Sequence, residues 1–430
     1  MTERKYDLVV LGATGYTGQY VAEEVGRIVE KQPSLTYAFA GRNKEKLERT
    51  LETARANTGL DLAKAELLVV DVNDEESLKK MAAQTKVVIN CVGLKLTSFF
   101  MQYRYYGLKV VKACVEEGAN HVDISGEPQY LEQAQLEYSE AAREAGVHVV
   151  GSCGFDSIPA DLGTTFLQEV FPGDVNSVEA VVTMDDDSEG KASINFTTME
   201  CAVLGLTHSK ELKGLRKKLF TTPLPKPSFK PEPRGKLFHS DEAKRWCVPN
   251  MASDHSVVMR TQRILYEKEQ MRPTQFKVYF GMTRLNAVLS IFFGILFYIL
   301  TKISFTRSLL LKYPEFFTGG VVTRQGPRRS DLTGLKFLVV LTGKGWDRKL
   351  EDPAQQHTEP PNVTKTVRVK GPDPGYFGTA ILITQSALTI LEEKDKLPQE
   401  GGVFPPGAAF LKTSLRQRLE KKGIQFTVDE

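Results

Sequence analysis

The most constraining feature of this chain is a glycine-rich turn near its start, placed between a short apolar run and a helical pattern. The strand formers Leu8–Leu11 are followed by three glycines at three-residue spacing, Gly12, Gly15 and Gly18. Apolar residues then recur at helical spacing from Tyr20 onward. This order of strand, turn and helix is typical of the first half of a dinucleotide-binding βαβ unit, whose helix start binds a pyrophosphate.

Each glycine has its own expected role in such a unit. Gly12 permits the tight turn, Gly15 lets the backbone approach the pyrophosphate, and Gly18 lets the helix pack on the strand. A glycine-rich turn that binds no ligand is the weaker alternative. The residues expected at the cofactor are Gly12, Ala13, Thr14, Gly15, Tyr16, Thr17 and Gly18.

The end of the second strand indicates which cofactor is bound. This strand is expected at 36–40, and the chain continues with Arg42 and Lys44. An Asp or Glu here would bind the ribose 2′-hydroxyl of NAD, whereas a basic residue suits a 2′-phosphate. We therefore expect NADP(H) rather than NAD(H). The alternative is that Arg42 is only a solvated residue at the start of the next helix.

Strand and helix patterns alternate through the first 150 residues, which predicts a parallel, doubly wound sheet. Further strands are expected at 65–70, 86–92, 121–124 and 147–151, and helices at 44–58 and 108–118. The carboxyl ends of parallel strands meet at one edge of the sheet, where such folds bind ligands. Asp71, Cys91, Val92 and Gly93 follow these strands and are expected at the cofactor. Asp71 either contacts the adenine or only caps the next turn.

The predicted fold class is α/β, with a Rossmann-type parallel sheet, a second α/β domain with a mixed sheet, and a hydrophobic segment. A length of 430 residues allows two to three domains. We expect a nucleotide-binding domain at 1–165, a second domain at 166–375 that contains the apolar segment 285–317, and a C-terminal segment at 376–430. Residues 213–218 and 221–233 are expected to form a basic, proline-rich surface loop without regular structure.

Composition excludes several classes of function. The net charge is only +3, with 56 basic and 53 acidic residues, so nothing favours binding to nucleic acid. The five cysteines are scattered and form no C-x-x-C pair, which argues for a reducing compartment and against a metal site. The N-terminus carries no apolar signal core. We therefore expect a protein on the cytoplasmic side that is not secreted.

A second apolar feature lies far from the turn. Leu285–Thr301 contains no charged residue, and Arg284 and Lys302 flank it. As a helix it would be about 25 Å long, short of the hydrocarbon core of about 30 Å. Three alternatives stay open: a buried core helix, a membrane span, and a monotopic insert in one leaflet or a lipid monolayer. The insert is favoured, because aromatic residues near basic flanks suit an interface.

Six stretches together resemble the saccharopine dehydrogenase-like oxidoreductases, and the resemblance runs from end to end. They lie at 12–18, 40–42, 90–93, 123–128, 154–163 and 401–409. The nucleotide domain is also similar to saccharopine dehydrogenase and to mycobacterial trans-acting enoyl reductases of glycolipid synthesis. The resemblance implies a Rossmann domain, an α/β domain, and a C-terminal segment that returns to the first. It also implies association of the animal members with lipid droplets.

The chain departs from this family at one place. Residues 94–102 stand where family members usually have a single proline, so the loop is eight residues longer. Because this loop follows the fourth strand, it is expected over the nicotinamide. The longer loop therefore puts in doubt whether it closes over the cofactor as the shorter loop of other family members is expected to do.

Hydride transfer needs a cofactor in contact with an acceptor and often a proton donor, but no protein nucleophile. Tyr103, Arg104 and Tyr106 crowd the loop after the fourth strand. A tyrosine there could donate a proton, and Arg104 could polarise a carbonyl. These three residues are the catalytic candidates.

Three carboxylates follow the next two strands: Asp123, Glu127 and Asp156. They either contribute to the same site or only cap helices and tie loops together. The Ser-Tyr-x-x-x-Lys pattern of short-chain dehydrogenases is absent from the sequence.

Two hypotheses for the function follow. The first is an NADP(H)-dependent oxidoreductase that acts on a small-molecule or lipid-like substrate and binds a lipid droplet or membrane surface through Leu285–Thr301. The second is a catalytically silent adaptor at that surface that keeps nucleotide binding. Cleavage of saccharopine is the least favoured reaction, because a soluble amino acid gives no reason for the apolar run. Association into a homodimer stays open.

Overall fold

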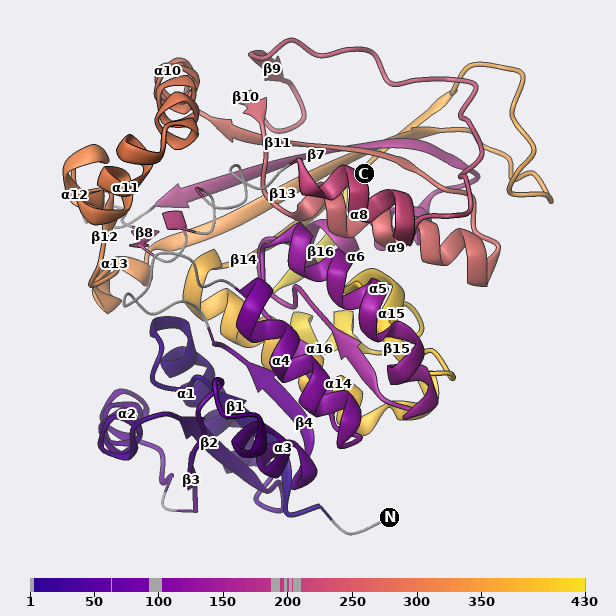
Figure 1. The fold of residues 1–430 in the computed structure, drawn as a ribbon. Helices are drawn as coiled ribbons and strands as arrows, with labels where there is room; N and C mark the ends of the chain where they lie inside the picture. The colour runs from indigo at the N-terminus through magenta and orange to yellow at the C-terminus, as the bar shows by residue number, and fades with distance from the viewer. Residues whose placement is uncertain are drawn as a thin grey trace. The chain divides into compact units, whose positions relative to one another are not determined.

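The computed structural model describes residues 4–62, 64–92, 103–186, 194–196, 199–200, 203 and 210–429. They form two compact units (Figure 1). The first unit combines residues 1–155 with residues 375–422, and the second combines residues 156–374 with residues 423–430. Each unit is therefore built from two separate parts of the chain.

The first unit is organised around a seven-stranded sheet in the order β15-β6-β5-β4-β1-β2-β3. All its neighbouring strands pair in parallel, which confirms the predicted doubly wound sheet. Its strands are β1 (Tyr6–Leu11), β2 (Tyr37–Gly41), β3 (Glu66–Val69), β4 (Thr85–Asn90), β5 (Asn120–Asp123), β6 (His148–Val150) and β15 (Gly402–Phe404). The order reverses between β1 and β4, and ligands of such sheets bind at this kind of switch point.

The helices of this unit follow the alternation of strands and helices in the sequence. They are α1 (Tyr16–Lys31), α2 (Lys44–Thr58), α3 (Glu75–Ala83), α4 (Tyr103–Glu116), α5 (Pro128–Glu144), α14 (Thr379–Glu392), α15 (Pro406–Ala409) and α16 (Leu415–Glu420), with the short turns η1 (Pro374–Gly378) and η2 (Lys394–Lys396). The bounds of α2 are as predicted, because Asn43 caps its start and Gly59 ends it with a positive φ of 71°. Helix α4 begins five residues before the predicted start at 108. The predicted start was wrong there. Tyr106, in the added first turn, is partly buried and packs against the core cluster that contains Val110 and Cys114 of the same helix.

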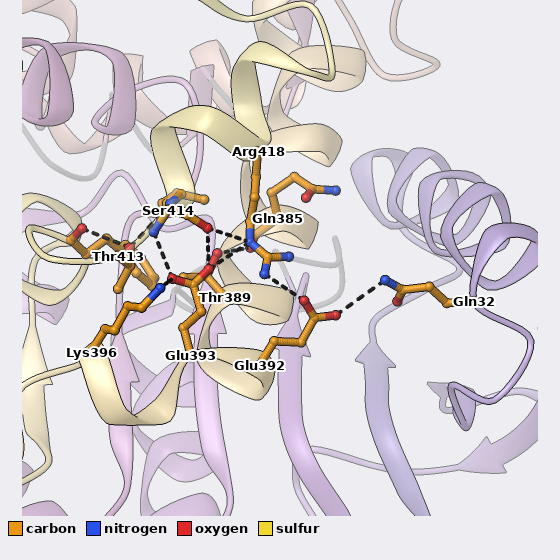
Figure 2. Close-up of polar contacts among 11 residues, drawn as sticks. Gln32, Gln385, Thr389, Glu392, Glu393, Lys396, Thr413, Ser414 and Arg418 are labelled. Carbon is orange, nitrogen blue, oxygen red and sulfur yellow. Dashed lines mark hydrogen bonds and ion pairs between the residues drawn. The ribbon is translucent and has the colours of Figure 1, made fainter.

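The C-terminal part of this unit is held in place by Glu393, at the end of α14 (Figure 2). Its carboxylate accepts hydrogen bonds from Ser414 Oγ, Ser414 N (2.9 Å) and Arg418 Nε (3.0 Å), and it pairs with Lys396 Nζ (3.1 Å). Burial would raise the pKa of Glu393, but the bonds from Ser414 and the two cations outweigh it and lower the pKa to about 2. Neighbouring Glu392 pairs with the same Arg418 (2.6 Å). One charged cluster therefore fastens α16 to α14.

The second unit contains a mixed seven-stranded sheet in the order β16-β14-β13-β7-β11-β10-β9. Its strands are β7 (Val175–Asp186), β9 (Phe238–Ser240), β10 (Arg245–Pro249), β11 (Gln275–Met282), β13 (Leu335–Gly345), β14 (Val363–Pro372) and β16 (Gln425–Val428). In this sheet β7 and β11 pair in parallel, and the other neighbouring strands that the structure describes pair antiparallel. Helices α6 (Ile158–Val170) and α9 (Asp254–Glu269) pack on this sheet (Figure 1). The predicted mixed sheet is therefore confirmed.

The stretch predicted to lack regular structure is partly helical. Residues 211–219 form α8 (Glu211–Leu219), so the prediction was wrong for 213–218. Leu212, Leu215 and Leu219 are half-buried at helical spacing, and this spacing gives the basic segment an amphipathic pattern. Residues 221–233 form neither helix nor strand, as predicted.

The predicted apolar helix is α10 (Arg284–Lys302), which continues into α11 (Ser304–Lys312) and α12 (Pro314–Phe317). Two short strands, β8 (Ile194–Asn195) and β12 (Val322–Thr323), and helix α13 (Arg329–Leu332) accompany them. Only Ala287 and Thr301 of α10 are buried. The helix is therefore not a core helix, and that alternative is wrong.

We expect Glu393→Gln to lower the free energy of unfolding at pH 7 by about 2–3 kcal/mol, because the depressed pKa represents stabilisation of the ionised form. This contribution is present above the unfolded pKa and is lost as the pH falls toward the folded value. Urea unfolding should therefore show wild-type stability falling between roughly pH 4.5 and pH 2 more steeply than that of the variant.

Glu400→Gln is the matched control. Its side chain is 62% exposed and its carboxylate lies 3.5 Å from Arg143 Nε, so removal of its charge should cost less than about 1 kcal/mol. Equal stability of the Glu393 variant and the wild type at pH 7 would contradict the anchoring role.

Candidate functional site

The glycine turn is shaped by the close approach of β1 to β4. Gly12 has a φ of 86°, and a Cβ there would lie 2.9 Å from the carbonyl carbon and oxygen of Cys91. A Cβ on Gly18 would overlap the carbonyl oxygen of Gly12. Only glycine therefore fits at these two positions without moving the backbone.

The turn leads directly into the start of α1. Gly15 is the residue before the helix and has no side chain that could cap it. The first N–H groups of a helix have no acceptor within the helix, and its dipole favours an anion there. The nearest atom to a Cβ on Gly15 would be the Gly12 oxygen, at 3.2 Å. The turn therefore fits the pyrophosphate of a dinucleotide.

The ends of β2 and β3 lie beside this turn in the sheet. Arg42 and Lys44 are exposed directly after β2, while the Asn43 side chain accepts from Lys46 N (2.7 Å) and caps α2. Asp71 accepts from Asn73 N (3.0 Å) and Asn73 Nδ2 (3.2 Å). Asp71 thus makes the turn-capping contact, and its contact with adenine stays a prediction. Exposed cations after β2 suit a 2′-phosphate.

The end of β4 provides backbone rather than reactive side chains. Cys91 N donates to Leu11 O (2.8 Å), and Val92 N donates to Asn90 Oδ1 (3.0 Å). Burial raises the pKa of the Cys91 thiol to about 12, so the thiol is neutral and is no nucleophile at physiological pH. Gly93 and the insertion at 94–102 lie outside the described residues.

A neutral histidine connects β4 to β5. Because Asn90 Oδ1 accepts from Val92 N, its amide nitrogen faces His121 Nε2 at 3.3 Å, and that ring nitrogen is the acceptor. Burial lowers the pKa of His121, which keeps the imidazole neutral. In the described structure, the contact of His121 with Asn90 therefore joins β4 to β5.

Asp123 ties together three segments at the carboxyl edge of the sheet. Its Oδ1 accepts from Ser125 N (2.9 Å) and Ser152 N (3.0 Å), and its Oδ2 accepts from Tyr130 Oη (2.7 Å). Both Asp123 and Tyr130 are fully buried, at 0% and 1% exposure. These contacts of Asp123 are of the kind expected if its carboxylate only ties loops together. The hydrogen bond from Tyr130 was not predicted, because no pattern in the sequence indicates it.

Ser152 is held in a strained conformation by the same network. Its φ of 61° is uncommon for a residue other than glycine. Its hydroxyl donates to Ser125 O (2.5 Å), and the next residue, Cys153, donates from N to Asp123 O (2.6 Å). Strained residues held this firmly cluster at functional sites. Ser152 was not predicted, because no sequence pattern indicates a positive φ at serine.

The catalytic candidates lie at the start of α4. The side chains of Tyr103 and Arg104 lie outside the described part of the structure. Tyr106 is half-buried, with Lys109 Nζ 5.7 Å from its ring centre. The catalytic roles of all three residues therefore stay predictions.

The two other carboxylates have backbone contacts in the described structure. Glu127 precedes α5, and its N donates to Ser125 Oγ (3.2 Å). Asp156 precedes α6, and its carbonyl oxygen accepts from Ser253 Oγ (3.1 Å). Among the described residues, no group of three His, Cys, Asp or Glu side chains is placed to hold a metal ion.

The second unit carries an extended apolar surface on α10, α11 and α12, which lie next to one another (Figure 1). We call these residues the apolar surface: Leu285, Val288, Leu289, Phe292, Phe293, Ile295, Leu296, Tyr298, Ile299, Ile303, Phe305, Tyr313, Phe316 and Phe317. Each is at least 36% exposed, and Phe316 reaches 82%. By length and composition, α10 is the one helix in the described residues that could cross a membrane. Contiguous apolar areas of this kind mark interaction surfaces.

Comparison with known proteins identifies the family. Residues 8–150 match the family model of the saccharopine dehydrogenase NADP binding domain. The chain is 40% identical over 432 residues to the human saccharopine dehydrogenase-like oxidoreductase, and the match covers 99% of this chain and 98% of that protein. The chain belongs to this family. It is an oxidoreductase by family, and its first domain is of the NADP-binding kind, which confirms the resemblance and the cofactor preference read from the sequence.

Two further comparisons gave a similar protein and a similar solved structure. A protein of Caenorhabditis elegans named lipid droplet localized protein is 36% identical over 430 residues, covering 99% of this chain and 98% of its own length. The apo histidine-tagged saccharopine dehydrogenase of Saccharomyces cerevisiae has a TM-score of 0.53 at 14% identity, covering 99% of this chain and 100% of that structure. This second likeness shows a shared fold alone.

Gly12→Ala tests the shape of the turn. We expect it to lower the free energy of unfolding by roughly 3 kcal/mol or more, because a methyl group collides with the Cys91 backbone and the positive φ adds strain. Binding of NADPH should also be lost. Urea unfolding and a titration with NADPH measure the two effects.

Gly59→Ala is the control matched in φ. Gly59 has a φ of 71°, but a Cβ there would meet nothing within 4 Å. Its substitution should cost only about 1–2 kcal/mol and leave NADPH binding intact. If both variants lowered the free energy of unfolding equally little and both still bound NADPH, the turn would have no tight steric requirement.

Proposed function

We propose that this protein transfers a hydride between NADP(H) and a lipid-like substrate at the surface of a lipid droplet or membrane. The observation that carries the proposal is the apolar surface on α10–α12, in a chain whose first domain is of the NADP-binding kind. A soluble substrate such as saccharopine gives no reason for so much exposed apolar area. The setting would be lipid metabolism, for which glycolipid synthesis is one candidate.

The nucleotide is proposed to lie along the carboxyl edge of the first sheet. The backbone of Gly12–Gly18 would hold the pyrophosphate, and Arg42 would bind the 2′-phosphate. Cys91 and Val92, which directly follow the carboxyl end of β4, would lie beside the nicotinamide ring. When bound, the cofactor supplies or accepts the hydride.

The chain's own residues would position the acceptor and manage the proton. The Asp123–Tyr130 bond and the held conformation of Ser152 keep the loops at this edge rigid. Arg104 is proposed to polarise a carbonyl of the substrate, and Tyr103 or Tyr106 to donate the proton. The neutral Cys91 thiol takes no part as a nucleophile.

We propose that α10 inserts in one leaflet rather than across a membrane. Near its start, the Arg284 guanidinium lies 5.2 Å from the ring centre of Trp246 on β10. Near its end, Thr301 is buried, and Phe297 and Leu300 pack against the cluster that contains Leu310. Both ends of α10 are therefore attached to the same folded unit, which suits a helix lying in the plane of a lipid surface. The name of the C. elegans relative supports a lipid droplet as that surface.

Arg42→Ala tests the assigned phosphate contact. NADPH should bind roughly 10- to 100-fold more weakly, because a charge-assisted hydrogen bond contributes about 1.5–3 kcal/mol. NADH lacks the 2′-phosphate, so its affinity should hardly change. Isothermal titration with each cofactor gives the ratio.

Arg49→Ala is the control for loss of a nearby positive charge, since Arg49 is exposed on α2. It should leave both affinities within about twofold of the wild type. Equal weakening of NADPH and NADH in the Arg42 variant would contradict the contact.

Turnover tests the substrate class. We expect NADPH oxidation when vesicles contain lipids with a ketone or a carbonyl-conjugated double bond, and none with saccharopine precursors in solution. A Phe292→Ser/Phe293→Ser variant should keep NADPH affinity but lose turnover on vesicle lipid. Turnover of the soluble amino-acid substrates alone would overturn the proposal.

A further inference from the structure

Basic residues accompany the apolar surface along the whole segment that forms it. Between residues 284 and 329 the chain has seven basic residues and a single acidic one, Glu315. We call four of them the basic rim: Arg284, Lys302, Lys312 and Arg324. All four are exposed, and they come from both ends of α10, from the end of α11, and from the segment after β12.

Each residue of the basic rim lies over an aromatic ring. The charged groups of Arg284, Lys302, Lys312 and Arg324 lie 5.2, 4.8, 5.3 and 4.5 Å from the ring centres of Trp246, Tyr298, Tyr313 and Phe196. Stacking of this kind holds a cation at the edge of an apolar area without neutralising it. Paired aromatic and basic residues are typical of the level at which lipid headgroups begin.

The cations of the basic rim differ in their contacts. Arg324 directs its guanidinium to the carbonyl oxygens of Leu311 (2.8 Å) and Lys312 (3.0 Å). Arg324 also interacts electrostatically with the carboxylates of Glu315 and Glu200. By contrast, no ion pair joins Arg284 or Lys312 to an acidic side chain within the described part of the chain. Arg284 and Lys312 are therefore available to an external anion beside the apolar surface.

We propose that the apolar surface docks on a lipid leaflet that contains anionic phospholipid, and that the basic rim binds the phosphates of its headgroups. This inference rests on the lipid-surface docking of the proposed function and adds the headgroup class. Insertion of apolar side chains and attraction to anionic lipid reinforce each other at such a surface. A second copy of the chain suits this face less well, because a two-fold contact would bring the like-charged rims together.

Flotation of the full-length protein with vesicles tests the headgroup class. One set of vesicles is phosphatidylcholine alone, and the other contains phosphatidylserine in addition. We expect the affinity to be about tenfold or more higher on the anionic vesicles, and the difference to shrink as salt is raised. Light scattering before the vesicles are added gives the oligomeric state.

Two variants separate the contributions. Arg284→Gln/Lys302→Gln/Lys312→Gln should bind both vesicles as weakly as the wild type binds phosphatidylcholine. Phe292→Ser/Phe293→Ser/Phe316→Ser should bind neither, because these side chains are exposed and would insert. Thermal unfolding and NADPH affinity equal to the wild type show that both variants are folded.

The outcomes distinguish the inference from the proposal beneath it. Equal wild-type affinity for both vesicles would overturn the headgroup preference while leaving the docking intact. Absence of binding to either vesicle would overturn the docking itself. A dimer that the serine variant dissociates would assign the apolar surface to a second copy and overturn both.

Discussion

The first unit depends on one close contact, the approach of the Gly12 backbone to the backbone of Cys91. Gly12 N donates to Ala40 O (2.9 Å) and Cys91 N donates to Leu11 O (2.8 Å), so the ends of β1, β2 and β4 are fixed against one another. No side chain fits between them. This contact places the start of α1 at the point where the strand order reverses. The start of a helix at such a switch point is where dinucleotide-binding sheets typically bind phosphates.

The features predicted well are those that short stretches of sequence determine. The glycine turn, the bounds of α2 and the extent of α10 each follow from spacing, caps or an uninterrupted apolar run within about 20 residues. Strand β15 was missed, because three residues form a strand only through pairing with β6, more than 200 residues earlier. The start of α4 was also misplaced. Its first turn contains Tyr106, which packs on core residues of other elements, and such tertiary contacts are not visible in local spacing.

The candidate site divides in the same way. The glycine turn was predictable, because three glycines at fixed spacing between a strand and a helix are typical of a dinucleotide site. Binding of phosphates by this turn stays a prediction. The network of Asp123, Tyr130 and Ser152 was not, because it joins loops about 30 residues apart through contacts that leave no periodic pattern. Such pairings depend on the register of β5 and β6, and register is a property of the folded sheet. The sequence of α10 did not indicate whether the helix is buried in the core or exposed. The exposure of most of its side chains in the structure shows that it is not a core helix.

The central claim is that the turn at Gly12–Gly18 binds the cofactor of this oxidoreductase and that this cofactor is NADP(H). The most direct test is a fluorescence titration of the purified wild-type protein with NADPH and, separately, with NADH. We predict saturable NADPH binding and much weaker binding of NADH. If protein shown to be folded bound neither cofactor, the turn would be structural only and the central claim would be contradicted.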